Sequence, residues 1–211
     1  MKKNKQVKGR KMSQSWWGQA WNSHFEAMAD FENRMGRGRT YARHGYLLDL
    51  NIKEGKVMAK VQGSAPRPYR ISINIRPLSK KHWSALKNKI KDKLSSIQDL
   101  LNGKFPLDIG KILTDPQSGL FPAKNEIVMS CSCPDWAYLC KHLAATLYGI
   151  GHEFDKDPQL FFTLRGVQVA ELVDFALKDA SQKLIGKKVQ SPRILSQNDN
   201  SLSDLFGIDF V

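Results

Sequence analysis

Residues 131–142 read CSCPDWAYLCKH, and this stretch holds all three cysteines of the 211-residue chain with one of its five histidines. The candidate ligands are Cys131, Cys133, Cys140 and His142, arranged as C-x-C, six intervening residues and C-x-H. Three thiolates and an imidazole form a Cys₃His set, which suits tetrahedral structural zinc and leaves no position open for a catalytic water. The sequence therefore predicts a zinc site at these four residues.

Two other interpretations of the cysteines compete with zinc. Cysteine is often buried as a small apolar residue, but burial alone does not explain three of them within ten residues beside a histidine. A redox pair normally has C-x-x-C spacing next to a strand and a helix, whereas this chain has C-x-C and a third thiol. Only metal binding accounts for all four residues.

The residues around the cysteines predict a strand, a knuckle and a helix. The stretch EIVMS, residues 126–130, reads as a strand, and the C-x-H end is expected to begin a helix whose exposed amides favour thiolates. Two cysteines in C-x-C spacing can face one ion if Ser132 bends outward. We expect Trp136 and Tyr138 to cover the site and exclude water.

An antiparallel meander is predicted upstream. Three segments alternate apolar and polar residues and are rich in Val and Ile, as strands are. The first two are joined by a hairpin turn with glycine at Gly55, and the last two by the proline-containing loop GSAPRPY. The segments are YLLDLNI (46–52), KVMAKVQG (56–63) and YRISINIRP (69–77).

Helices are predicted before and after these strands. Residues 15–28 place Trp17, Trp21, Phe25 and Met28 on one helical face, which indicates a core role. Residues 79–101 form a second amphipathic pattern whose other positions are rich in lysine. We therefore assign the fold class as α+β: a small antiparallel β-meander packed with helices, plus a zinc-bound strand-knuckle-helix unit.

The charge balance points to a polyanionic partner. The chain has 33 Lys and Arg against 20 Asp and Glu, a net charge of +13, and nucleic acid leads the possible partners. Five arginines are the candidate phosphate contacts: Arg34, Arg37, Arg39 and Arg43 surround two glycines, and Arg67 lies in the proline loop. A solvated helix face explains the first four equally well.

Other classes of protein are disfavoured. The chain lacks the phosphate-binding G-x-x-x-x-G-K-[ST] motif and the metalloprotease motif H-E-x-x-H. We therefore expect that the protein is not an enzyme. It has no run of eighteen apolar residues and no signal peptide, so we expect no membrane partner and a cytoplasmic location.

Five segments organise the chain in this interpretation. They are a disordered basic arm (1–14), an N-terminal α+β region (15–125), the zinc finger (126–152), a helical extension (153–186) and a flexible tail (187–211). The tail ends in the apolar motif LSDLFGIDFV, which either packs on its own domain or docks in a partner's groove.

The zinc stretch also resembles a known family. The C-x-C and C-x-H pairs match the signature of SWIM-type zinc fingers, and SWWGQAW, GRGRTYARHG and VQGSAPRPYRISI resemble upstream blocks of the bacterial members. The resemblance covers roughly residues 15–175. It implies a zinc-dependent module that binds DNA, in preference to RNA, or other proteins, and an association with helicase-like ATPases. An adaptor that docks on such an ATPase without binding nucleic acid is the alternative function.

Overall fold

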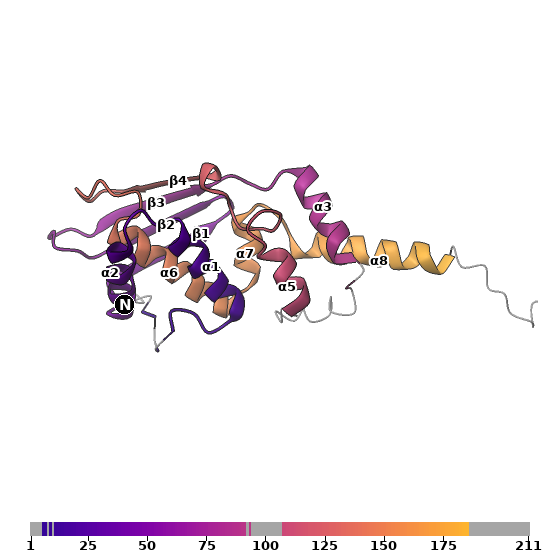
Figure 1. Ribbon diagram of the computed structural model, residues 1–211, viewed down its shortest axis with the longest axis horizontal. Coiled ribbons are helices and arrows are strands. Elements are labelled where there is room, and N and C mark those ends of the chain that lie inside the picture. The colour runs from indigo at the N-terminus through magenta and orange to yellow at the C-terminus, as the bar shows by residue number, and fades with distance from the viewer. Residues whose placement is uncertain (1–5, 8, 10, 92, 94–106, 186–211) are drawn as a thin grey trace, which may run out of the picture. The chain divides into compact units, whose positions relative to one another are not determined.

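The computed structural model describes residues 6, 7, 9, 11–91, 93 and 107–185 (Figure 1). The chain divides into two compact units, Met1–Ala176 and Leu177–Val211. The first unit contains the sheet and most of the helices. Of the second unit, the structure describes the C-terminal part of a helix, so the apolar terminal motif expected to pack or to dock lies outside the described residues.

A four-stranded antiparallel sheet forms the upper layer of the first unit in Figure 1. Its order follows the chain: β1 (Leu47–Lys53), β2 (Lys56–Val61), β3 (Tyr69–Ile75) and β4 (Ile127–Cys131). The β1–β2 turn contains Gly55 with a φ of +62°, a conformation that glycine adopts without a steric penalty. The predicted meander is confirmed, and β4 extends it.

The finger segment is part of this sheet and not a separate layer. Strand β4 pairs with β3 from Ile71 opposite Cys131 to Ile75 opposite Ile127. The boundary expected between residues 125 and 126 therefore does not separate two folding units, because both sides belong to the first unit.

Helix α6 (Lys141–Lys156) is the centre of the core. It contacts all four strands, and α1 (Trp16–Ala27) and α2 (Glu32–Arg43) pack against it, as Figure 1 shows beneath the sheet. The stripe expected on α1 is confirmed, since Trp21 and Phe25 are buried and Trp17 and Met28 pack at its edges.

The strands are two-faced because one side of the sheet meets these helices. In β2, Val57, Ala59 and Val61 are buried, while the alternate side chains are exposed. This alternation is the pattern of an antiparallel sheet with one solvated face. The sheet therefore presents a polar surface on the side away from α6.

The remaining helices of the described residues follow β3 in the chain, three of them before β4 and two after α6. They are α3 (Lys80–Ile90), α5 (Leu107–Leu113), a 3-10 helix (Lys124–Glu126), α7 (Gln159–Leu164) and α8 (Val169–Ile185). In α3, Ser79 caps the N-terminus and Trp83, Leu86 and Ile90 are buried, as expected. The expected continuation over residues 94–101 lies outside the described residues. Among the helices that are described, none has the length and apolar character needed to cross a membrane.

The N-terminal arm differs from its expectation. Val7 and Met12 are buried in the core, and the backbone N–H of Val7 donates to the carbonyl of Ala42 at 3.1 Å. The prediction of disorder over 1–14 counted the like charges and overlooked these two apolar side chains. For the described residues of this segment, the arm is anchored on α2.

Candidate metal centre

The four predicted ligands come together at the end of β4 and the start of α6. Their sulfur and nitrogen donor atoms all lie within 4.8 Å of one another. Cys131 ends β4, Cys140 is the N-cap of α6, and His142 lies in the first turn of that helix. The Nδ1 atom of His142 lies 3.8 Å from the sulfur of Cys131 and 4.0 Å from that of Cys140.

These separations suit a small tetrahedral ion. Bonds of about 2.3 Å to sulfur and 2.0 Å to nitrogen place tetrahedral donors roughly 3.5–3.8 Å apart. All three cysteines are free, so no disulfide competes for the sulfurs. The cluster could therefore bind a metal ion after a small contraction. The donor set of three thiols and one imidazole is the type that favours zinc.

The electrostatics of the cluster favour a bound cation. A hydrogen bond from the Cys131 thiol holds the pKa of Cys140 well below its usual value, and the N–H of Leu143 at the start of α6 adds to this effect. The same bond raises the pKa of Cys131, and burial raises that of Cys133. Without a metal, these shifts favour a cluster in which Cys140 alone is a thiolate and the other two cysteines remain thiols. A divalent cation would compensate the repulsion and let the other two ionise.

Aromatic rings hold His142 in place. The ring centroid of Tyr69 lies 4.5 Å from that of His142, and that of Tyr41 lies 5.5 Å away. A Cβ atom added at Gly63 would lie 2.8 Å from Nε2 of His142. The glycine of the proline-containing loop therefore makes room for the imidazole, a role that its sequence context did not indicate.

Asp30 anchors the knuckle from a distant part of the chain. Its carboxylate accepts hydrogen bonds from the backbone N–H groups of Tyr138 at 2.8 Å and Leu139 at 3.3 Å. Burial acts to raise the pKa of Asp30, but these bonds outweigh it and the pKa is lowered. A second link is the ion pair between Arg34 and Asp135, at 3.2 Å. Nothing in the sequence pointed to Asp30, because the contact spans more than a hundred residues.

The bend at Ser132 is confirmed. Its backbone N–H donates to the carbonyl of Arg70, and its hydroxyl accepts from the N–H of Arg70 at 3.0 Å. The serine thus continues the pairing with β3 while Cys131 and Cys133 remain part of the cluster.

The aromatic cover expected over the metal differs from the prediction. Trp136 is 82% exposed and does not shield the cluster. Tyr138 is partly buried, with the ammonium of Lys124 4.7 Å from its ring. Ala137 and Leu139 are the buried residues of this loop, because alternate side chains face inward where Asp30 holds the backbone.

The arginines expected to contact phosphates do not form one patch. Residues 32–43 are helical, and along a helix Arg34 and Arg37 point to one side while Arg39 and Arg43 point to the other. Arg37 is exposed, Arg43 is partly buried, and Arg67 is exposed in the β2–β3 loop. The guanidinium of Arg39 bonds Glu26 at 2.8 Å.

One of the two glycines among these arginines, Gly38, serves helix packing. A Cβ at Gly38 would lie 2.4 Å from that of Ala144, so α2 and α6 cross at this point with almost no space between them. Phosphate contact by these arginines stays a prediction, but it would have to be made from the surface of a helix. The helical alternative is the one that the structure bears out.

Pairing in the sheet creates a different basic surface. On the solvated face, Lys53 lies opposite Lys56 and Lys60 lies opposite Arg70, and all four are exposed. Asp49 on β1 lies opposite Lys60 and adds one carboxylate beside these paired cations. We call these four cations the basic face. The sequence did not reveal it, because the residues become neighbours only through the strand register.

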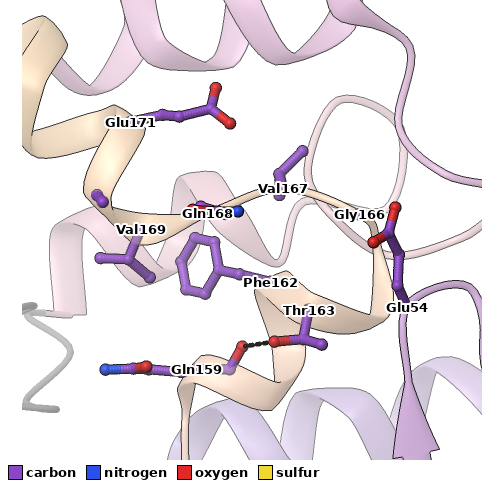
Figure 2. Close-up of a pocket in the computed structure, with 10 residues that line it drawn as sticks. Glu54, Gln159, Phe162, Thr163, Gly166, Val167, Gln168, Val169 and Glu171 are labelled. Atoms are coloured by element: carbon purple, nitrogen blue, oxygen red, sulfur yellow. Dashed lines mark hydrogen bonds between the residues drawn. The ribbon is translucent and has the colours of Figure 1, made fainter.

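A cavity of about 520 Å³ lies elsewhere in the first unit, between the β1–β2 turn and the residues around α7 (Figure 2). Glu54 and Glu171 contribute carboxylates to its wall, and Phe162 and Val167 contribute apolar surface. One oxygen of Glu171 accepts from the indole N–H of Trp83 at 2.8 Å. None of the lining residues belongs to the metal cluster or the basic face.

The chain is similar to a curated protein over most of its length. The chain is 37% identical over 163 residues to the uncharacterized protein Rv2102 of Mycobacterium tuberculosis. The match covers 77% of this chain and 58% of that protein, so the chain spans less than two thirds of its relative. No protein-family profile and no solved structure matches the chain.

Proposed function

We propose that this chain is a zinc-binding module of the SWIM type that binds nucleic acid, and DNA in preference to RNA. The Cys₃His donor set supports zinc, and the chain itself supplies all four donors, which is the arrangement of a structural site. In this proposal the metal joins β4 to α6 and performs no catalysis.

The observation that carries nucleic-acid binding is the pairing of like charges on the basic face. Lys53 faces Lys56 and Lys60 faces Arg70 across adjacent strands. Like charges in such positions destabilise a sheet. A phosphate backbone laid across the strands would remove this repulsion, because each phosphate sits between cations. Binding would therefore relieve the like-charge pairing of Lys53 with Lys56, and that part of the Lys60–Arg70 repulsion which Asp49 does not offset.

The number of available cations sets the expected salt dependence. The basic face and Arg67 of the neighbouring loop provide five exposed cations. If each neutralises one phosphate of duplex DNA, the logarithm of the binding constant should fall with the logarithm of salt concentration at a slope of about −4.5.

The test compares Lys60→Gln with the control Lys81→Gln. Lys60 belongs to the basic face, whereas Lys81 is an exposed lysine on α3. Binding of labelled DNA is measured by fluorescence anisotropy across a salt series, with zinc content determined on the same samples. We expect Lys60→Gln to weaken binding and to reduce the slope by about one, while Lys81→Gln does neither.

A stability measurement on the same variants separates charge from misfolding. Because Lys60→Gln removes both the repulsion with Arg70 and the attraction to Asp49, its melting temperature without DNA should stay close to that of the wild type. A salt-independent affinity, or no binding by protein with one zinc per chain, would contradict the proposal. It would favour the adaptor role on a helicase-like ATPase.

A further inference from the structure

The most exposed large hydrophobic side chain in the described part of the molecule lies on the knuckle. Trp136 is 82% exposed, and its ring meets that of Phe31, itself 39% exposed, at a centroid distance of 5.6 Å and an angle of 88°. A perpendicular contact of this kind leaves most of the indole surface in solvent. The knuckle thus presents an aromatic surface that the metal site does not use.

The loop that carries Trp136 is anchored on both sides. Cys133 and Cys140 belong to the cluster of candidate metal ligands, and Asp30 holds the backbone of residues 138 and 139 through two hydrogen bonds. The neighbouring Asp135 is tied to Arg34. Because these contacts fix the backbone, little conformational entropy remains to be lost when a ligand contacts the indole.

Cations flank the aromatic pair. The guanidinium of Arg34 lies 6.0 Å from the centroid of the Phe31 ring, and Arg37 is exposed one turn further along α2. At the start of the knuckle, Ser132 is hydrogen-bonded to Arg70, a member of the basic face. A polyanion that crosses the basic face would therefore reach the knuckle at Arg70.

We propose that Trp136 is a stacking surface for an unpaired base, so that the module binds single-stranded nucleic acid more tightly than duplex. The inference rests on the nucleic-acid function proposed above and specifies its substrate. Aromatic side chains beside cationic grooves bind single strands in this way, because every base offers a π face. In a duplex, those faces are covered by neighbouring base pairs.

The experiment measures the affinity of full-length, metal-loaded protein for oligo-dT and for a duplex of equal length at one salt concentration. We expect Trp136→Ala to weaken binding of oligo-dT by roughly 5- to 150-fold, the contribution of one stacked base, with duplex affinity nearly unchanged. Trp136→Phe should retain most of the affinity. Leu107→Ala, which truncates another exposed apolar side chain, serves as the control and should have no effect.

Intrinsic fluorescence gives a second readout. The chain has five tryptophans, and Trp136 is the exposed one while Trp21 and Trp83 are buried. Oligo-dT should quench wild-type emission excited at 295 nm. The same quenching should be absent in Trp136→Phe, although that variant still binds.

The outcomes distinguish this inference from the function on which it rests. If the wild type binds nucleic acid but Trp136→Ala loses nothing, or loses single-strand and duplex binding equally, stacking on Trp136 is refuted and the basic face stands. If the wild type binds neither ligand, the proposed function fails and this inference fails with it.

Discussion

Substitutions at the two glycines of α2 test the helix crossing that supports the knuckle. Gly36 and Gly38 lie two residues apart in the same helix, but their surroundings differ. A Cβ at Gly36 meets no atom within 4 Å, whereas a Cβ at Gly38 would lie 2.4 Å from that of Ala144 and 3.0 Å from two backbone atoms of α6. Ala is therefore expected to have opposite effects at the two positions.

The magnitudes follow from helix propensity and overpacking. Replacing Gly by Ala inside a helix stabilises it by about 1 kcal/mol, and at Gly36 nothing opposes this gain. At Gly38 the added methyl is about 1 Å closer than ordinary contact, and such overpacking costs about 1–3 kcal/mol. Because the backbone of α6 must move, we expect the cost to exceed the propensity gain, with a net loss of up to about 2 kcal/mol.

Thermal denaturation of the metal-loaded variants measures the difference. For a chain of this size, 1 kcal/mol corresponds to a shift of about 2–4 °C in melting temperature. Gly36→Ala should melt about 2–4 °C above the wild type, and Gly38→Ala below it, with one zinc per chain in both. If Gly36→Ala were destabilised, or if both variants shifted in the same direction, residues 32–43 would not form the helix on which the site is built.

Three further predictions concern the knuckle. Cys140→Ser should reduce zinc to less than one ion per chain, measured by elemental analysis, and lower the melting temperature, because the variant loses one donor and the thiolate cap of α6; unchanged metal and stability would exclude a zinc site here. Asp30→Asn should speed zinc transfer to a chelator at neutral pH, since it weakens the bonds to Tyr138 and Leu139, while Asp49→Asn on β1 should not; equal rates would show that Asp30 does not hold the loop. Because the pKa of Asp30 is lowered on folding, its stabilisation is complete above about pH 4 and is lost as the pH falls through the folded value, so wild type and Asp30→Asn should converge in melting temperature in acid.

The sequence predicted features that depend on local patterns. The alternation of apolar and polar residues along each strand and the glycine of the hairpin turn are short-range patterns. Together they predicted the meander. The ligand spacing identified four residues whose donors the fold brings together. Each of these inferences required only residues that are close in the sequence.

Features that depend on tertiary contacts could not be predicted in this way. The basic face arises from strand register, and Asp30 contacts the knuckle across more than a hundred residues. Trp136 was expected to cover the metal site and exclude water, but the side chains that face inward are those of Ala137 and Leu139. The arginines that cluster in the sequence do not share one surface, because successive positions on a helix face different directions.

The separation in sequence between α2 and α6 has a consequence for how the protein is made. During synthesis, α1, α2 and the first three strands leave the ribosome before α6, the helix against which they pack, has been translated. The core can therefore close only after the last ligands, Cys140 and His142, have emerged, and such distant contacts form slowly. If the cluster binds zinc as proposed, metal capture and core closure coincide, and a nascent chain in a zinc-poor cell would expose its apolar faces to chaperones and proteases.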